Sequence, residues 1–293
     1  FPKEGCNMAK MSMVFVLLLL AGCGNEPPLS LRVMSFNIRF DNPDDGPNAW
    51  PQRREMASGL IREVNPDVLG LQEALLHQIE QLQDDLPEYA WFGVGRDDGQ
   101  SAGEFSPIFY RKDKFELLMQ ETLWCSETPH QPGLGWDAVC NRVITWGGLR
   151  DRGTGKIAVI FNTHWDHIGE NARLQSAVLL RNEVAKVIPG EYVVVTGDFN
   201  CPPGSPPYRH LVAARENGGE PVLFDSRKRS LQAPQGPTGT FNAFGPEAVR
   251  PEPIDHIFVG EGISVQRFAT LDKAVNGRMP SDHFPVVAEM VCQ

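Results

Sequence analysis

Six clusters of acid, amide or imidazole side chains lie along this chain of 293 residues, each close to one end of a stretch typical of a β-strand. The clearest cases are residues 196–200, which close the apolar run 193–195, and residues 279–287 near the end of the chain. Strands of one sheet bring their ends to a common edge, so side chains far apart in sequence can meet there. Buried polar groups also need partners, because an unmatched polar group in an apolar interior is destabilising. The pattern therefore predicts a β-rich domain with a polar site at a sheet edge.

The hydrophobic pattern predicts ten strands and three helices. Many strands are apolar on both faces, which is typical of sheets that are covered on both sides. The number of strands is larger, relative to the number of helices, than in a simple doubly wound sheet. We therefore expect an α/β fold in which two sheets pack face to face with helices outside. The strands are predicted at residues 31–38, 68–72, 106–111, 115–124, 143–150, 156–163, 192–196, 254–259, 264–270 and 283–290, and the helices at 53–64, 75–86 and 171–188.

Five long loops connect these elements. Long loops in a compact domain are usually binding or lid segments, so we expect some of them to border the site. They are predicted at residues 41–52, 95–105, 126–141, 201–207 and 227–246.

The start of the chain predicts export. A cationic residue, Lys10, precedes the apolar stretch 13–20, which is shorter than the ~20 residues that a membrane span needs. The segment Leu-Ala-Gly-Cys that ends at Cys23 resembles a bacterial lipobox, and a plain secretory signal is the alternative. We expect a lipoprotein signal peptide at 1–22, a lipidated tether at 23–30 and one domain at 31–293. The protein is then exported and lipid-anchored to a bacterial membrane through Cys23, facing the periplasm or the surface.

The net charge and the cysteines each exclude one class of function or site. The whole chain has a net charge of −10, and without residues 1–22 the count is 25 basic against 36 acidic side chains. This acidity argues against a non-specific binder of duplex DNA. An oxidising compartment permits disulfides, and Cys125 with Cys140 is the preferred pair because the two flank a loop rich in Pro and Gly. Three pairings remain open for Cys125, Cys140, Cys201 and Cys292, and no Cys-x-x-Cys spacing indicates a thiolate zinc site.

The polar clusters have ordinary explanations when each is taken alone, such as a turn cap, a first-turn acid or a buried histidine with a backbone partner. The clusters are Asn37, Glu73, His164 with Asp166 and His167, Asp198 with Asn200, Asp255, and Asp282 with His283. Together, and in this order, they resemble the endonuclease/exonuclease/phosphatase superfamily over residues 31–291. The segment 163–167 and the helix after it are most similar to the deadenylase-like and phosphatase-like bacterial branch.

The resemblance implies a four-layer α/β sandwich and hydrolysis of phosphoesters with Mg²⁺, which Mn²⁺ can replace. Glu73 is the implied principal metal ligand, supported by Asn37 and Asp282, because hard divalent cations prefer oxygen donors. Asp198 is expected to orient or deprotonate the attacking water. Asn200 is expected to donate to the phosphoryl oxygens, and Asn37 also to touch the substrate.

Four further side chains are implied to act on the phosphate. His283 is expected to contact it, with Asp255 holding the imidazole tautomer. His164 and His167 are expected to be additional phosphate contacts, and a cationic imidazole can assist the leaving oxygen. Arg142 is expected to bind phosphate through its two-pronged guanidinium.

One position departs from the family pattern. Some members carry an acid two residues after the first Asn, whereas this chain has Arg39, which either meets a substrate phosphate or pairs with a nearby acid. Trp136 and Phe241 either stack on a base or sugar or anchor their loops.

The substrate stays open among nucleic acid, phospholipid headgroups and sugar or inositol phosphates, and a monomer is expected. Two other functions remain as alternatives. One is a catalytically silent lipoprotein that binds ligands with the same fold. The other is a dinuclear metallophosphoesterase, whose Asp-x-His and Gly-Asn-His segments are missing from the sequence.

Overall fold

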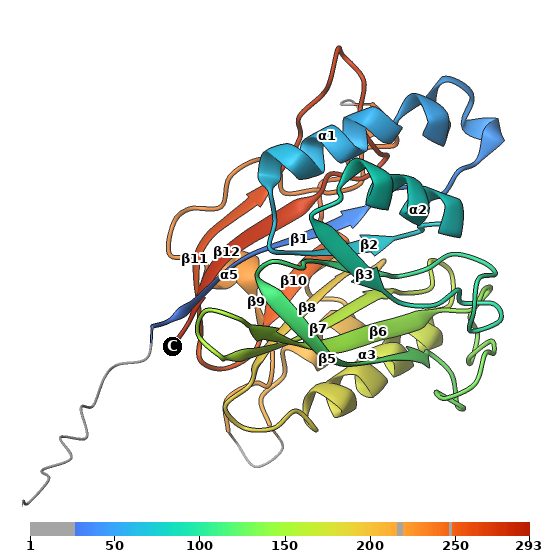
Figure 1. The fold of residues 1–293 in the computed structure, drawn as a ribbon. Coiled ribbons are helices and arrows are strands. Elements are labelled where there is room, and N and C mark those ends of the chain that lie inside the picture. Colours follow the sequence, from blue (N-terminus) through green and yellow to red (C-terminus); the bar gives the residue numbers. More distant parts are fainter. Residues whose placement is uncertain (1–26, 216–218, 246–247) are drawn as a thin grey trace, which may run out of the picture.

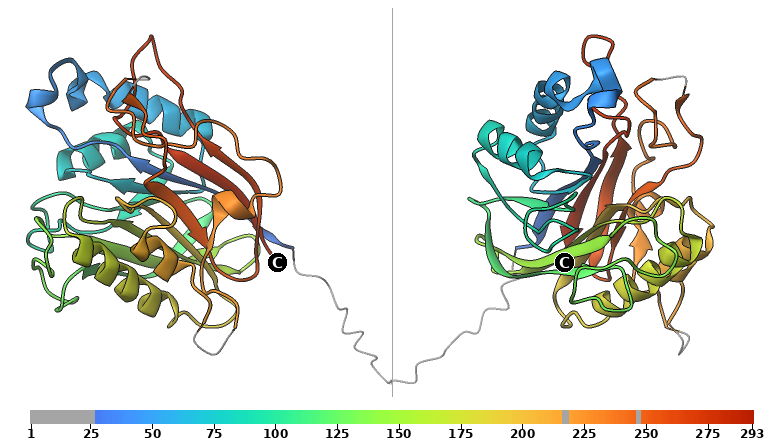
Figure 2. Two further views of the ribbon diagram at one scale, coloured as in Figure 1. Left: turned by 180° about the vertical axis from the view of Figure 1, so that it is seen from behind. Right: turned by 90° about the vertical axis from the view of Figure 1, so that its right-hand side faces the viewer.

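Two six-stranded sheets pack face to face in the computed structural model, which describes residues 27–215, 219–245 and 248–293. Helices α1 and α2 cover the outer face of one sheet, and α3 covers the outer face of the other (Figure 1). Figure 2 shows α3 on the opposite side of the molecule from α1 and α2. The predicted sandwich of two mixed sheets with outer helices is therefore confirmed.

The first sheet joins the beginning and the end of the chain. Its strand order is β11-β12-β1-β2-β4-β3. Only the β1–β2 pair is parallel, and every other pair is antiparallel. The strands are β1 (Leu29–Asn37), β2 (Val68–Gln72), β3 (Tyr89–Phe92), β4 (Ile108–Arg111), β11 (Ile263–Thr270) and β12 (Val286–Cys292), and the covering helices are α1 (Arg54–Val64) and α2 (Leu76–Asp85).

The second sheet holds the middle of the chain, in the order β5-β6-β7-β8-β10-β9. Its one parallel pair is β7–β8, which α3 connects. The strands are β5 (Phe115–Trp124), β6 (Val143–Asp151), β7 (Ile157–His164), β8 (Tyr192–Asp198), β9 (Phe224–Asp225) and β10 (Asp255–Val259). The helices that belong to this half are α3 (Glu170–Val184), α4 (Pro206–Leu211) and α5 (Ser226–Arg229), whereas the short 3₁₀ turns η1 (Pro43–Asn48) and η2 (Trp50–Gln52) lie between β1 and α1.

A polar network crosses the largely apolar space between the sheets. Asn162 on β7 donates to the carbonyl oxygens of Leu71 (2.7 Å) and Pro107 (2.9 Å) in the opposite layer. Its own oxygen accepts from Gln72 (2.7 Å) and from Thr196 (3.0 Å). Because a buried amide that meets several partners tolerates little displacement, this network fixes the two sheets relative to each other near the strand ends.

Most strands were predicted to within a few residues of their observed bounds. The short strands β3 and β9 were not predicted. The last strand was predicted at 283–290 but begins at Val286, because Phe284 N instead donates to Thr240 O and His283 forms an isolated bridge to Phe241. At the other end, β1 begins at Leu29, two residues before the predicted domain start.

The preferred disulfide was wrong. Cys125, Cys140, Cys201 and Cys292 are all free thiols. Cys125 is buried in the core beneath α3, whereas the Cys140 thiol faces the Asp166 carboxylate at 3.6 Å. The signal peptide and Cys23 lie outside the described residues. Within the described ranges, no helix is both long and apolar enough to cross a bilayer.

Candidate active site

The predicted site residues meet where strands of both sheets end. Asn37 ends β1 and Glu73 follows β2, while His164 and Asp198 end the parallel pair β7 and β8. Asp255 begins β10, which runs antiparallel to β8 and places Asp255 opposite Asp198. The two parallel pairs therefore deliver their carboxyl ends to one edge of the sandwich, as the sequence pattern predicts.

Asp198 is at the centre of the cluster and is almost completely buried. Its Oδ2 accepts from Asn37 Nδ2 at 3.0 Å and lies 3.5 Å from His164 Nε2 and 3.7 Å from His283 Nε2. Its Oδ1 accepts from the backbone N–H of Asn200 at 3.0 Å. Burial and the neighbouring Asp255 carboxylate raise the pKa of Asp198 to about 7. This carboxylate is therefore suited to act as a base near neutral pH.

His283 and Asp255 form a buried pair beside Asp198. Asp255 Oδ2 lies 2.9 Å from His283 Nδ1, which directs the imidazole Nε2 toward Asp198. Burial alone would lower the pKa of His283, but the Asp255 and Asp198 carboxylates raise it well above the ordinary value. Phe241 packs edge-on against this imidazole with ring centroids 5.2 Å apart, and the guanidinium of Arg250 covers Phe241 at 4.7 Å. Phe241 thus contacts the site.

His164 is a second buried imidazole beside Asp198. Its Nε2 lies 3.1 Å from Asn200 Nδ2, and Glu104 Oε2 lies 4.0 Å from its Nδ1. Burial, with added repulsion from Arg142 and Arg96, lowers the pKa of His164 well below the ordinary value. Neither Glu104 nor Arg96, which are paired at 2.7 Å, was predicted from the sequence. The only sequence signal for them was their place in the long loop 95–105.

Glu73 and Asp282 supply further oxygen donors. Glu73 Oε1 accepts from Asn37 Nδ2 at 3.0 Å, and its Oε2 accepts from the backbone of Phe40 at 3.2 Å. Asp282 is mostly buried, and burial raises its pKa. Arg39 lies between the two carboxylates, 3.8 Å from Glu73 Oε2 and 4.0 Å from Asp282 Oδ2, and forms two hydrogen bonds with Asp45. Of the two alternatives for Arg39, the structure shows pairing with acids.

The donor set fits a hard divalent cation. Ligand atoms of Glu73, His164 and Asp198 all lie within 4.8 Å of one another, and the same holds for Asp198, Asp255 and His283. Asn37 bridges Glu73 and Asp198, and Asp282 lies on the far side of Arg39. Each of these two triads has two carboxylates and one imidazole, and carboxylate oxygens are ligands that Mg²⁺ and Mn²⁺ prefer. The Asn37 amide turns its Nδ2 toward Glu73 and Asp198, while its Oδ1 accepts from the backbone N–H of Arg39 at 3.0 Å.

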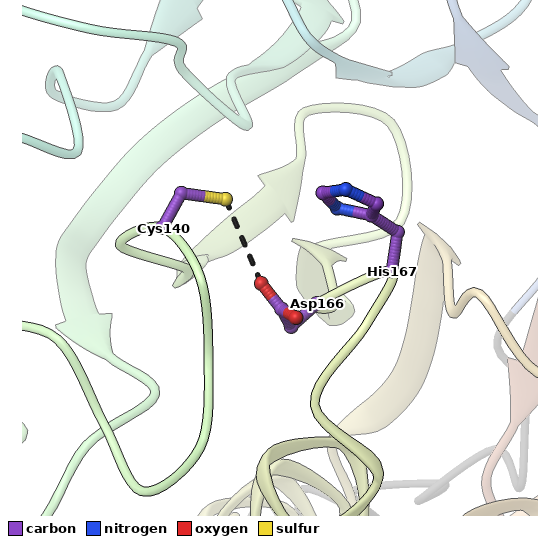
Figure 3. Close-up of side chains that lie close together, drawn as sticks. All are labelled: Cys140, Asp166 and His167. Carbon is purple, nitrogen blue, oxygen red and sulfur yellow. Dashed lines mark hydrogen bonds between the residues drawn. The ribbon is translucent and has the colours of Figure 1, made fainter.

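A third cluster, of Cys140, Asp166 and His167, connects two loops (Figure 3). The Asp166 carboxylate already accepts from the backbone N–H groups of Val139 (3.1 Å), Ile168 (3.0 Å) and Gly169 (2.7 Å). The bond from Val139 joins the loop 126–141 to the segment after β7, and the other two hold that segment in its turn, so the cluster is a structural joint.

Two predicted substrate contacts lie beside this joint rather than against Asp198. His167 is exposed, and its Nδ1 lies 3.1 Å from Arg142 Nη2. Arg142 itself is buried next to His164. Trp136 packs in the outer core beneath α3, which favours the interpretation as a loop anchor.

The comparisons with known proteins agree with this arrangement. The profile of the Endonuclease/Exonuclease/phosphatase family matches residues 34–283. An endonuclease/exonuclease/phosphatase family protein of Bacteroides thetaiotaomicron is 38% identical, with a TM-score of 0.84 over 91% of this chain and 99% of that chain. A mannosyl-6-phosphatase of Bacteroides thetaiotaomicron VPI-5482 is 37% identical, with a TM-score of 0.82 over 89% of this chain and 99% of that chain. An uncharacterized protein of Acanthamoeba polyphaga mimivirus is 25% identical, covering 88% of this chain and 98% of its own length. This chain therefore belongs to the endonuclease/exonuclease/phosphatase family.

Proposed function

We propose that this protein is a Mg²⁺-dependent phosphoester hydrolase that acts as a monomer. The observation that carries the proposal is the buried Asp198 carboxylate, which Asn37, His164 and His283 surround within 3.7 Å. In such a site a water molecule and a phosphoryl group can be held together in a protected, polar environment.

The proposed reaction is the attack of water on phosphorus. Asp198 accepts one proton from the water, the new P–O bond forms, and the bond to the leaving oxygen breaks. Protonated His283 donates to the phosphate and can give a proton to the leaving oxygen, while Asp255 holds the imidazole in place. Asn200 and the neutral His164 bind phosphoryl oxygens, and Arg142 and His167 add contacts at the edge.

Glu73, Asn37 and Asp282 are the residues that would hold Mg²⁺. When bound, the ion supplies positive charge that stabilises the phosphoryl oxygens in the transition state. Arg39 carries positive charge between Glu73 and Asp282 and so balances part of the same acidic cluster.

The proposed substrate class is a sugar phosphate. The support is the mannosyl-6-phosphatase, which is 37% identical to this chain over almost its whole length. The net charge of −10 disfavours nucleic acid as the main substrate.

We also propose that the protein is exported and held at a membrane by lipid on Cys23. Replacing Cys23 with Ala should move the protein from the membrane to the soluble fraction, and continued membrane association would contradict the anchor.

The function is tested with the purified protein, p-nitrophenyl phosphate and mannose 6-phosphate, in Mg²⁺ and in EDTA. Activity is expected only with the divalent ion. Asp198→Asn and His283→Ala should each lose at least about 10²-fold in kcat, because each removes a group that acts in the transition state. Asp272→Asn, at an exposed position, is the matched control. Wild-type rates in both site variants would disprove the assigned roles.

A further inference from the structure

Arg53 is a buried cation behind the candidate active site. It directly precedes α1, and its side chain is closed off from solvent. Nη1 donates to the carbonyl oxygens of Ile38 (2.7 Å) and Pro280 (2.9 Å), Nη2 to that of Arg39 (3.3 Å) and Nε to that of Asn48. Within the described ranges, none of the hydrogen bonds from this side chain goes to a carboxylate. The guanidinium therefore holds backbone rather than forming an ion pair.

This position is unfavourable for a positive charge. A buried cation loses its hydration, and a direct ionic partner is the usual compensation. Burial lowers the pKa of Arg53 to about 10, although the charges of Asp282 and Asp45 oppose this shift. A residue that is unfavourable at a buried position is expected where it performs a task that an apolar side chain cannot perform.

The carbonyl groups that Arg53 binds lie where two neighbouring strands separate. β1 pairs with β12 as far as Ser35, which lies opposite Val286. Beyond this point β1 runs on to Asn37 in the site, and Asp282 lies in the segment that leads into β12. Because Nη1 of Arg53 donates to one carbonyl in each segment, a single nitrogen atom links the end of β1 to the segment of Asp282.

The segment of Asp282 is fixed from its other side as well. The backbone N–H groups of Asn242 and Ala243 donate to Asp282 O at 2.7 Å and 3.1 Å. A second link to β1 comes from Ser281, whose Oγ donates to Asn37 O at 2.7 Å. Asp282 is thus held between the 242–243 segment and the end of β1, and the bonds to β1 determine how far it lies from the other site residues.

Arg53 also supports the strained turn at Arg39. Arg39 has a φ angle of 58°, and its carbonyl oxygen accepts from Arg53 Nη2 and, at 3.1 Å, from Gln78 Nε2. A strained conformation persists only where its surroundings fix it. These two bonds therefore help to keep the Arg39 side chain between the carboxylates of Glu73 and Asp282.

We propose that Arg53 is a positioning residue that fixes the separation between the Asp282 segment and the end of β1 and thereby determines how tightly the site binds its divalent cation. This inference rests on the proposed function and adds a determinant of metal binding that is not itself a ligand. Ligands from separate segments bind a cation tightly when folding has already ordered them, because binding then has no ordering cost. Arg suits this task better than Lys, since its planar fork reaches several carbonyl groups at once.

Calorimetric titration of the full protein with Mg²⁺ tests the inference. Arg53→Lys keeps the charge but loses the fork, and it should raise the Kd for Mg²⁺ by at least about 10-fold, as is typical when a residue that supports metal ligands is lost. With p-nitrophenyl phosphate as substrate, the Mg²⁺ concentration for half-maximal rate should rise by a similar factor. The kcat at saturating Mg²⁺ should stay within about 3-fold of wild type, because excess cation restores the loaded site.

Two control variants separate this effect from a general loss of stability. Arg54→Lys changes the neighbouring arginine, which is partly exposed and paired with Asp85 at 2.8 Å, and it should leave the Kd unchanged. Tyr89→Phe removes a buried hydrogen bond to Pro66 O (2.6 Å), which lies ahead of β2, at the end opposite Glu73. This variant should lower the Tm but keep the wild-type Kd.

A second variant tests the same link if Arg53→Lys does not fold. Ser281→Ala removes the hydrogen bond to Asn37 O and should raise the Kd for Mg²⁺ by at least about 3-fold, since part of the connection to β1 is lost.

Two results would overturn the inference. One is a folded Arg53→Lys protein, or in its place Ser281→Ala, that binds Mg²⁺ with the wild-type Kd. The other is an equal loss of affinity in Tyr89→Phe. A wild-type protein that neither binds Mg²⁺ nor hydrolyses the ester would instead refute the proposed function itself.

Discussion

Three residues of the site have a left-handed backbone, which side chains other than glycine rarely adopt. The φ angles are 58° at Arg39, 62° at Glu73 and 47° at Asn200. Each such residue is unfavourable by on the order of 1–3 kcal/mol and persists only where its surroundings fix it. At Glu73 the turn brings the carboxylate to Asn37 and to the backbone of Phe40. The conformation therefore places oxygen donors that a regular strand end could not place.

Mg²⁺ should raise the thermal stability of the protein, and this effect should depend on Glu73. Glu73 and Asp198 both face Asn37, so a bound cation relieves their mutual repulsion and stabilises the folded state by mass action. Millimolar Mg²⁺ should raise the Tm by a few degrees over EDTA, measured by scanning calorimetry. Glu73→Gln should abolish this increase, and the exposed control Glu80→Gln should retain it. A full increase in Glu73→Gln would show that Glu73 is not the principal ligand.

The buried His256 should make stability depend on pH. Burial lowers the pKa of His256 in the folded state, and its Nε2 lies 3.1 Å from Cys201 O. The unfolded chain then binds more protons, so the free energy of unfolding falls as the pH drops through the unfolded pKa near 6.5. Each unit of pKa difference corresponds to about 1.4 kcal/mol. In urea titrations, His256→Gln should lose less stability between pH 7.5 and 5.5 than wild type or the exposed control His130→Gln. Equal losses in all three would contradict this account.

At the scale of single elements, α3 begins with a cap supplied from another loop. The N-cap residue Gly169 has no side chain to offer, and Asp137 from the loop 126–141 accepts from Asn171 N (3.2 Å) and Ala172 N (2.6 Å) instead. Because capping carboxylates also favour the positive end of the helix, Asp137→Ala should reduce the free energy of unfolding by about 1 kcal/mol. Chemical denaturation measures this change against Asp272→Ala. A loss below about 0.3 kcal/mol would exclude the cap as a stabilising contact.

Elements with a strong periodic pattern were predictable from the sequence, and those that depend on tertiary partners were not. The apolar run 193–195 identifies β8 because strands buried on both faces need continuous hydrophobic residues. In contrast, the two-residue β9 exists only because Phe258 and Val259 of β10 offer a free edge. The last helix turn was placed too far along, since α3 ends at Val184 while the predicted helix ran to 188.

The site followed the same division. Side chains at strand ends, such as Asn37 and Asp198, were predicted to meet because parallel strands share an edge. Arg96 and Glu104 lie in a long loop whose path no local pattern determines, so their approach to His164 could not be predicted. The disulfide was predicted from loop composition alone, and the side-chain directions in the fold decided against it.

At the scale of the whole molecule, the cysteines should behave as isolated thiols. Cys140 is half-buried, and Cys125, Cys201 and Cys292 are buried. In the native protein an alkylating reagent should modify Cys140 first and slowly, since burial raises the pKa of its thiol. In denaturant without reductant, peptide mass spectrometry should find all four alkylated. A disulfide-linked peptide from any of the four would contradict the structure.

The first strand also separates the start of the domain from the active site. β1 starts at Leu29, opposite Cys292, and ends eight residues later at Asn37 in the site, a span of about 26 Å at ~3.3 Å per residue. Figure 2 shows the start of this strand next to the C-terminus. An attachment ahead of Pro27 would therefore act on the end of β1 that is farther from the site. A protein anchored to a membrane in this way would expose its active site to dissolved substrates and would face the membrane with the opposite end of the sandwich.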